Sequence, residues 1–371
     1  MSWEKNVRRA VPYVAGEQPR KPDIIKLNTN ECPYPPPPGV KRAAGKIDLD
    51  ALRLYPDPGA SILTDALAEY YHVRPEQVFV GVGSDDVLSM AFLTFFNSED
   101  PILFPDVTYS FYSVWAELYR IPYRTCALGE DLRIRPEDYS QPNGGVIFPN
   151  PNAPTGILES IGTVEKILQA NQDAVVIVDE AYVDFGGTSA LPLVEKYDNL
   201  LVVQTFSKSR AMAGMRIGFC IGSEKLISCL NDVKFSVNSY TMSLPAQVLG
   251  AEALRDEDYF RSVTGKIILT RERIKRELAE LGFSSTDSRA NFIFASHESI
   301  PAEELFTALR EAGIYVRYWK KPRIDNCLRI TVGTDEQMDR LMEFLGTYVG
   351  KSRILDCTAT IPEKIENGEV Q

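Results

Sequence analysis

The chain has 371 residues, of which 44% are hydrophobic and 25% charged, and its formal net charge is −11. This composition is typical of a folded globular protein, and the length predicts two domains. The acidic balance argues against binding of a nucleic-acid backbone as the main task. No apolar run approaches a membrane span and the first residues lack the apolar core of a secretory signal, so we expect a cytoplasmic protein.

Histidine and cysteine usage narrows the possible chemistry. The two histidines, His72 and His297, follow a predicted helix and a predicted strand, and we expect both at the surface. The six cysteines include no C-x-x-C pair, which indicates reduced thiols and no metal site. We therefore expect the acid–base chemistry of an enzyme here to come from lysine, aspartate, tyrosine or a cofactor.

The first stretch of the chain, residues 1–60, is irregular and rich in proline, with four consecutive prolines at positions 35–38. Proline runs favour extended backbone. The polar motifs LNTNE and YPD within this stretch favour an ordered arm on the protein surface, and we expect the same stretch to supply a segment of a smaller domain.

Residues 61–250 alternate between helical and strand patterns. The runs AVVIV and LLVV are apolar on both faces, which is typical of parallel strands covered by helices. The alternation predicts right-handed strand–helix–strand units and therefore one large α/β domain.

The pattern of predicted helices and strands changes after residue 250. A long charged helix is predicted from about Asp256 to Leu281, and short strands and helices follow it. We expect a smaller α/β domain over residues 251–350 and a polar C-terminal tail over 351–371.

Polar residues stand where the apolar strands of the large domain stop. In doubly wound sheets, ligands bind at the carboxyl ends of the strands, so these side chains should meet in one crevice. The positions at these strand ends are Gly83, Ser84, Asp85, Asp179, Tyr182, Thr205, Ser207 and Lys208.

Taken together, these groups indicate one ligand. Lys208 can form a Schiff base with an aldehyde, Asp179 can keep a pyridine nitrogen protonated, and Tyr182 can donate to a ring oxygen. Ser84, Thr205, Ser207 and Arg216 can hold a phosphate, partly through the start of a helix. Pyridoxal 5'-phosphate fits this description. Taken singly, each feature has a simpler explanation. Lys208 could be a surface lysine, Asp179 a turn residue, and the Gly83 motif an ordinary strand–helix turn.

The motifs that carry these residues resemble a known family. TFSKSRAMAGMRIGF is similar to the lysine signature of fold-type I pyridoxal-phosphate-dependent aminotransferases, and VIVDEAYVDF, PNPNAPTG, GVGSDDVL and CLRITVGT match in the same order. LNTNECPYPPPP, LRLYPDPGASIL and DVTYSFY are similar to the histidinol-phosphate aminotransferases. The resemblance covers nearly all of residues 5–348. It implies a homodimer whose large domain has a mostly parallel seven-stranded sheet between helices, with a smaller C-terminal α/β domain.

The resemblance also implies roles for individual residues. Lys208 would hold the cofactor and move the proton, with Asp179 at the ring nitrogen and Tyr182 at the ring oxygen. The remaining cofactor contacts would come from Gly83, Ser84, Asp85, Tyr109, Asn152, Thr205, Ser207, Arg216 and, from the neighbouring subunit, Tyr55. Substrate contacts would come from Tyr13, Asn30, Tyr55, Arg317 and Arg329.

One position departs from the family pattern. The family has asparagine directly before P-T-G, where it donates to the ring oxygen, whereas this chain has Ala153. The neighbouring Asn152 would point elsewhere on an unchanged backbone. Losing one hydrogen bond of about 1 kcal/mol should shift the cofactor's electronic properties without abolishing binding.

The function that the resemblance implies is transamination between L-histidinol phosphate and 2-oxoglutarate, giving imidazole acetol phosphate and L-glutamate, in histidine biosynthesis. An aromatic amino-acid aminotransferase and a phospho-amino-acid decarboxylase share the lysine motif and stay open as alternatives. A cofactor-binding regulatory module is the non-enzymatic alternative, but the chain has no spare basic helix-turn-helix segment.

Overall fold

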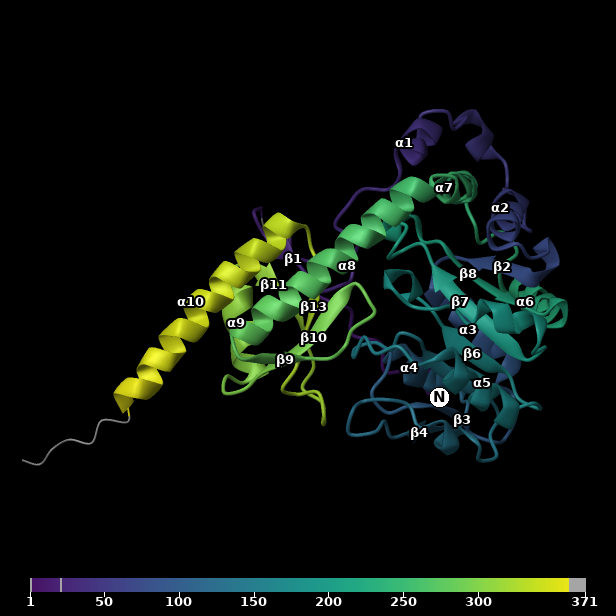
Figure 1. Cartoon of the computed structure of the whole chain (residues 1–371). Coiled ribbons are helices and arrows are strands. Elements are labelled where there is room, and N and C mark those ends of the chain that lie inside the picture. The colour runs from purple at the N-terminus through teal and green to yellow at the C-terminus, as the bar shows by residue number, and fades with distance from the viewer. Residues whose placement is uncertain (1, 21, 360–371) are drawn as a thin grey trace, which may run out of the picture.

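The computed structural model describes residues 2–20 and 22–359. Figure 1 shows a large body, which holds most of the helices and strands, beside a smaller body near the C-terminal end. Helix α8 (Glu257–Glu280) leads from the large body into the small one. This arrangement matches an α/β protein with a large and a small part, although the exact boundaries at residues 60, 250 and 350 stay a proposal.

A seven-stranded sheet forms the centre of the large body. Its strands pair in parallel except for β8, which runs antiparallel to both of its neighbours, so the expected mostly parallel sheet is confirmed. In sheet order the strands are β2 (Val78–Gly81), β8 (Gly218–Gly222), β7 (Leu200–Thr205), β6 (Val176–Asp179), β5 (Val146–Pro149), β3 (Ile102–Pro105) and β4 (Tyr123–Cys126).

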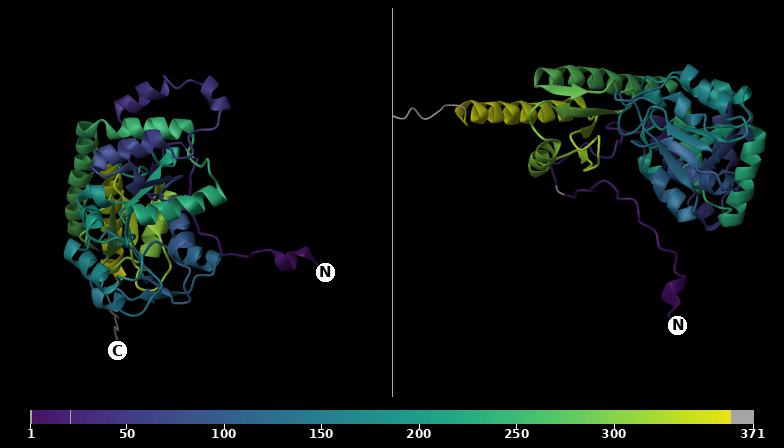
Figure 2. Two further views of the ribbon diagram at one scale, coloured as in Figure 1. Left: turned by 90° about the vertical axis from the view of Figure 1, so that its right-hand side faces the viewer. Right: turned by 90° about the horizontal axis from the view of Figure 1, so that it is seen from below.

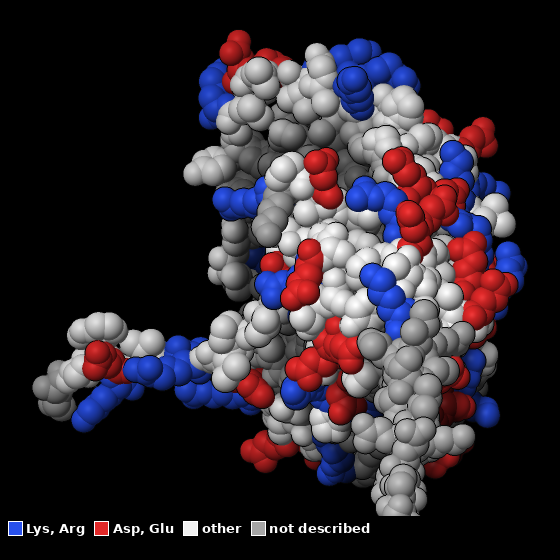
Figure 3. All heavy atoms as spheres, turned by 90° about the vertical axis from the view of Figure 1, so that its left-hand side faces the viewer, with Lys and Arg blue, Asp and Glu red and all other residues white. Residues whose placement is uncertain are grey.

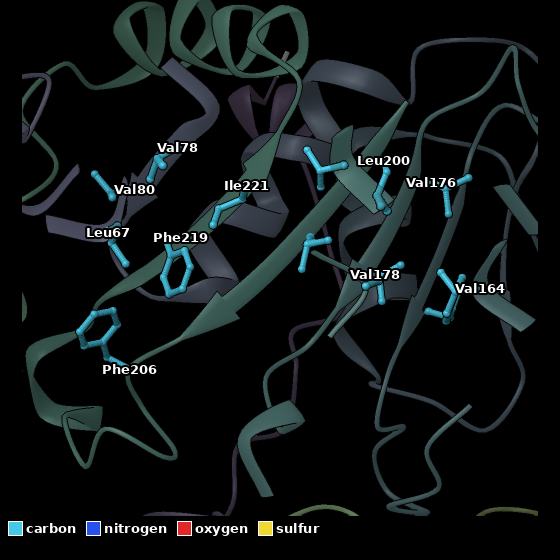
Figure 4. Close-up of a cluster of buried hydrophobic side chains, with 14 of the residues drawn as sticks. Leu67, Val78, Val80, Val164, Val176, Val178, Leu200, Phe206, Phe219 and Ile221 are labelled. Carbon is cyan, nitrogen blue, oxygen red and sulfur yellow. The ribbon is translucent and has the colours of Figure 1, made fainter. Parts of the chain in front are cut away.

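Helices cover both faces of this sheet because its central strands are apolar on both sides. Val176 and Val178 join one buried cluster (Figure 4), whereas Ile177 between them joins the cluster on the opposite face. Strand side chains alternate between faces, so an unbroken apolar run needs cover on both. The covering helices are α2 (Ser61–Tyr71), α3 (Ser84–Phe95), α4 (Phe111–Tyr119), α5 (Ile161–Ala170), α6 (Glu224–Val237) and α7 (Leu244–Leu254).

The small body contains an antiparallel sheet with its own apolar core. The N-terminal segment joins this core, because Ile25 pairs in parallel with Ile314 and both side chains are buried there. The elements are β12 (Arg317–Tyr318), β13 (Leu328–Thr331), β10 (Phe292–His297) and β9 (Phe283–Ser285), the pair β1 (Ile25–Lys26) and β11 (Ile314–Tyr315), and helices α8, α9 (Ala302–Glu311) and α10 (Asp335–Ala359).

The N-terminal region divides into two parts. The N-terminal end of the chain leads away from the body in Figure 2, and Figure 3 shows basic side chains along this projection. The Arg8 guanidinium reaches back to donate to the Leu118 carbonyl oxygen on α4. Pro38 begins α1 (Pro38–Ala44) as its first residue, a position where a missing N–H costs nothing. Short 3-10 turns complete the fold at Trp3–Asn6, Asp50–Arg53, Pro75–Gln77, Pro136–Tyr139, Val183–Phe185, Leu191–Glu195 and Ala213–Met215.

Two expectations from the sequence need correction. Helix α10 continues past residue 350 to Ala359, because the segment contains no proline before Pro362 to stop it; the rest of the expected tail, 360–371, lies outside the described residues. His297 is buried rather than exposed. Its Nε2 lies 3.0 Å from the Leu281 carbonyl oxygen and its Nδ1 accepts from Ile300, so the ring ties β10 to its neighbours.

In the part of the chain that the structure describes, no helix is both long and apolar enough to cross a membrane. Over the same residues, no group of three or more histidine, cysteine or acidic side chains is placed to hold a metal ion.

Candidate active site

A cavity of about 310 Å³ opens at the carboxyl ends of β6 and β7. One wall, here called the sheet wall, comes from the large sheet and the turns that follow its strands. The other, the clamp wall, comes from the N-terminal segment 13–31 and the small sheet. The cavity brings together most of the expected site residues: Tyr13, Asn30, Ser84, Asp85, Tyr109, Asp179, Tyr182, Thr205, Ser207, Lys208, Arg216, Arg317 and Arg329.

Lys208 lies three residues beyond the end of β7 and points into the cavity. Its Nζ donates to the carbonyl oxygen of Thr29 at 3.0 Å and lies 5.9 Å from the ring centre of Tyr182. Desolvation lowers the pKa of Lys208 to about 8, and the positive charge of Arg329 acts in the same direction. The unprotonated amine, which is the state a nucleophile or base requires, is therefore far more accessible near neutral pH than in an ordinary lysine, although the protonated form still predominates.

Asp179 is the last residue of β6, and its carboxylate is buried. Burial raises the pKa of Asp179 to about 6, while hydrogen bonds from the Tyr112 hydroxyl (2.9 Å) and the Ala181 backbone N–H (3.2 Å) lower it. The carboxylate is still mostly ionised at neutral pH. A buried, hydrogen-bonded anion of this kind favours a cationic partner in the cavity.

Tyr112 is a residue that sequence reasoning missed. It is buried on α4, three positions after Tyr109, and the two rings contact edge to face with their centres 5.7 Å apart. The spacing of the two tyrosines in DVTYSFY could have pointed to it. Tyr109 lines the cavity, and its hydroxyl donates to Asp85 Oδ1 at 2.8 Å.

An anion cradle lies at the start of α3. The Arg216 guanidinium donates to the Ser207 hydroxyl at 3.2 Å and to the Asp85 carboxylate at 3.4 Å. Gly83 precedes the helix with φ 88°, and a Cβ there would lie 2.4 Å from Arg216 Nη2. The glycine therefore allows the arginine to approach the first N–H groups of the helix, where anions bind favourably.

Thr205 and Ser207 complete this cradle from the end of β7. The Thr205 hydroxyl lies 3.1 Å from the Ser207 hydroxyl and also accepts from the Ser207 backbone N–H at 3.1 Å. Ser84 is the first residue of α3 and lines the same part of the cavity. The cradle thus offers hydroxyls, a guanidinium and a helix N-terminus to one anion.

Three predicted residues do not line the cavity. Gly83 acts through its backbone conformation, as described above. Asn152 points away, because its amide donates to the Val107 carbonyl (3.0 Å) and accepts from Thr108 (3.2 Å), leaving Ala153 at the cavity surface. Tyr55 is 82% exposed and stacks on Tyr240 with ring centres 4.7 Å apart.

The clamp wall carries two arginines. Arg329 on β13 donates from Nη2 to the Asn28 carbonyl oxygen at 3.0 Å, and its Nε is buried without a hydrogen-bond partner among the described residues. A buried orphan donor favours an anion at this position. Arg317 holds the backbone of the N-terminal segment through the carbonyl oxygens of Val14 (2.8 Å) and Ala15 (3.3 Å).

Aromatic rings and one carboxylate complete the clamp wall. Trp319 lies beside both arginines, with its ring centre 5.0 Å from the Arg329 guanidinium carbon and 5.3 Å from that of Arg317. Tyr13 stacks on Phe111 at 4.1 Å. Glu31, which the sequence analysis did not single out, lines the cavity and pairs with Lys26 at 2.5 Å.

Comparison with known proteins identifies the class. Residues 22–345 match the model of the aminotransferase class I and II family. The chain is 51% identical to a histidinol-phosphate aminotransferase of Lactococcus lactis subsp. lactis, over 96% of this chain and 99% of the relative, and 47% identical to one of Clostridium botulinum, over 94% and 99%. The chain belongs to the histidinol-phosphate aminotransferase family, and its enzymatic class is that of a transaminase.

Solved structures agree on the fold. The histidinol-phosphate aminotransferase of Clostridium acetobutylicum superposes with a TM-score of 0.82 at 21% identity, covering 88% of this chain and 100% of its own. That of Sinorhizobium meliloti, in complex with pyridoxal-5'-phosphate, gives 0.81 at 24% identity, covering 88% and 91%. The fold-type I assignment made from the sequence is therefore confirmed.

Proposed function

We propose that this protein transfers the amino group between L-histidinol phosphate and 2-oxoglutarate, with pyridoxal 5'-phosphate as cofactor, in histidine biosynthesis. The observation that carries the proposal is the position of Lys208 and Asp179 at the ends of adjacent strands of one sheet, facing a single cavity. Relatives named histidinol-phosphate aminotransferases at 47–52% identity over nearly the whole chain support the substrate.

The residues present fit this cofactor. A lysine amine, a buried carboxylate and a cationic cradle at a helix start match its aldehyde, pyridine nitrogen and phosphate respectively. Lys208, Asp179 and Tyr182 would hold its reactive ring, and Ser84, the Asp85 backbone, Thr205, Ser207 and Arg216 its phosphate. Tyr109 would stack on the ring. When bound, the cofactor supplies an electrophilic carbon and an electron-withdrawing ring.

The protein's own groups account for the proton transfer. Lys208 Nζ, whose pKa desolvation lowers to about 8, would accept the proton from the substrate Cα and deliver it to the electrophilic carbon that the cofactor supplies. Asp179 is ionised at neutral pH, so it would keep a nearby ring nitrogen protonated. The Tyr112 hydroxyl orients this carboxylate from behind.

The clamp wall would select anionic substrates. Arg329, whose Nε has no hydrogen-bond partner in the described part of the chain, would bind the phosphate of histidinol phosphate or the distal carboxylate of glutamate, because a guanidinium fork suits both. Arg317 and Tyr13 lie on the same wall and would support this grip. Both substrates of a transaminase use one cavity in turn, so one anion site can serve both.

We further propose a cytoplasmic homodimer. Tyr55 is exposed at the protein surface together with Leu49, Leu52 and Leu54, a group of apolar side chains that a second copy could cover. Tyr55 would then reach the cofactor phosphate of the neighbouring subunit.

The proposal is tested by supplying the protein, loaded with pyridoxal phosphate, with L-histidinol phosphate and 2-oxoglutarate. We expect stoichiometric formation of L-glutamate. In a parallel assay with a phosphorylated amino acid, which unlike histidinol phosphate carries a carboxylate, we expect no release of carbon dioxide. Release of carbon dioxide from a phosphorylated amino acid, or absence of glutamate, would contradict it. Cofactor binding without any turnover would favour a regulatory module.

A further inference from the structure

Asn30 occupies a junction between the N-terminal segment, the small sheet and the sheet wall. Its backbone N–H donates to the Thr331 hydroxyl at 3.0 Å, and its carbonyl oxygen accepts from the Asn291 side chain at 2.9 Å. The residue is 1% exposed, with φ 56°, a conformation in which asparagine is enriched. Its side chain is therefore held in one place.

The side-chain hydrogen bonds of Asn30 have a defined direction. The Thr331 hydroxyl donates to Asn30 Oδ1 at 2.9 Å, and Asn30 Nδ2 donates to the Tyr182 hydroxyl at 2.9 Å. The Thr331 oxygen already accepts the backbone N–H of Asn30, so its single proton is free for the amide oxygen. The opposite amide orientation would leave that proton without this acceptor.

This direction determines what Tyr182 can do. A phenolic hydroxyl has one proton, and its oxygen here accepts from Asn30, so the proton is available for an acceptor in the cavity. The Tyr182 ring is also fixed from the side by an edge-on contact with Phe292, with ring centres 5.1 Å apart. The hydroxyl consequently faces the cavity as a donor.

The family pattern provides a second hydrogen-bond donor to the ring oxygen, at the position before P-T-G, and this chain has no donor there. Ala153 lines the cavity where the family pattern has an asparagine, and Asn152 is turned away toward Val107 and Thr108. Of the two donors that the family pattern places at the ring oxygen, this chain therefore keeps Tyr182.

We propose that Asn30 is a positioning residue that fixes Tyr182 as the hydrogen-bond donor to the ring oxygen of the cofactor, through the chain Thr331–Asn30–Tyr182. This inference rests on the proposed cofactor and assigns Asn30 a role other than the substrate contact expected from the sequence. It links three segments that are distant in the chain to the electronic state of the ring.

The test is a spectrophotometric pH titration of the protein loaded with pyridoxal phosphate. A donated hydrogen bond stabilises the ring oxygen as an anion, so its loss should raise the pH midpoint of the visible absorbance change. Asn30→Gly removes the amide and tolerates the left-handed backbone, and we expect the midpoint to rise by about 0.5–1 pH unit. Thr331→Val should raise it by less.

The same two substitutions in a Tyr182→Phe background separate positioning from a direct effect. We expect neither to move the midpoint further, because the hydroxyl through which Asn30 acts is gone. Asn171→Ala, which removes a buried amide that donates to the Tyr139 carbonyl and does not line the cavity, should leave the midpoint unchanged.

An unchanged midpoint in both Asn30→Gly and Thr331→Val, or equal shifts with and without the Tyr182 hydroxyl, would overturn the inference. Thr331→Val keeps the test valid if the glycine variant does not fold. Absence of a visible band in the unaltered protein would instead contradict the proposed cofactor.

Discussion

The two walls of the cavity are built in different ways. On the sheet wall, Asp179 ends the buried strand β6, where it pairs with Val203 of β7, and Lys208 lies three residues beyond the end of β7. On the clamp wall, Arg317 donates to the Val14 carbonyl oxygen and the Asn30 backbone N–H donates to the Thr331 hydroxyl. Each contact joins segments about 300 residues apart in the chain. The sheet wall therefore suits chemistry that needs fixed geometry, and the clamp wall suits recognition of substrates that differ in shape.

Loss of Lys208 should have the largest effect. Lys208→Ala removes both the amine that would hold the cofactor and the group that would move the proton, so we expect transamination to fall by about 10³-fold or more. Steady-state glutamate formation measures it. Lys196→Ala, which removes an exposed lysine paired with Glu165, is the matched control. Retention of a tenth of the activity in Lys208→Ala would refute this role for the sheet wall.

Loss of Arg329 should impair recognition more than chemistry. Arg329→Leu removes the buried guanidinium, and we expect KM for histidinol phosphate and for glutamate to rise by about 10- to 100-fold, with a smaller change in kcat. Arg317→Leu should have a weaker effect, because that side chain mainly holds backbone carbonyls. Arg135→Leu, at an exposed pair, is the control. A fall in kcat at constant KM would contradict the division between the walls.

Asp179 should make the stability of the cofactor-free protein depend on pH. Burial raises its pKa from 3.8 to about 6, so the folded protein binds the proton more tightly than the unfolded chain. The stability this provides is present below pH 4 and is lost as pH rises to about 6. Relative to Asp179→Asn, the unaltered protein should lose about 3 kcal/mol of unfolding free energy across this range. Denaturant unfolding at several pH values measures it, and a constant difference between the two proteins would show that the assigned shift is wrong.

Ala153→Asn should have the smallest effect. A donor restored at the edge of the sheet wall should tighten cofactor binding by about fivefold, the equivalent of one hydrogen bond of about 1 kcal/mol. Fluorescence titration of the cofactor-free protein gives the Kd. Ala153→Val adds side-chain volume without a donor and should not tighten binding. Equal changes in both variants would point to packing instead of hydrogen bonding.

The sheet wall could be predicted because its signals are local. Apolar runs locate the strands, and the sheet places the residues at or shortly after the strand ends, as for Asp179 at the end of β6 and Lys208 three residues beyond β7. The substrate-binding arginines, Arg317 and Arg329, were predicted through the resemblance to the family. Local sequence alone carries no information on the contact between Asn30 and Thr331, since only the folded small body brings them together.

Other features depended on details that a sequence pattern does not contain. Tyr112 supports Asp179 because its hydroxyl on α4 reaches the end of β6. Asn152 turns away because its side chain bonds with Val107, Thr108 and Thr155. The burial of His297 likewise follows from the return of the chain after α8. These features result from how the side chains pack in the folded protein, and the sequence pattern alone does not determine that packing.

The most direct test of the central claim compares kcat/KM for L-histidinol phosphate with that for L-phenylalanine, using 2-oxoglutarate as acceptor and the unaltered protein. The clamp wall, with its buried guanidinium, should favour the phosphorylated substrate by at least about tenfold, the equivalent of one charged hydrogen bond. A tenfold preference for phenylalanine would contradict the account and identify an aromatic amino-acid aminotransferase.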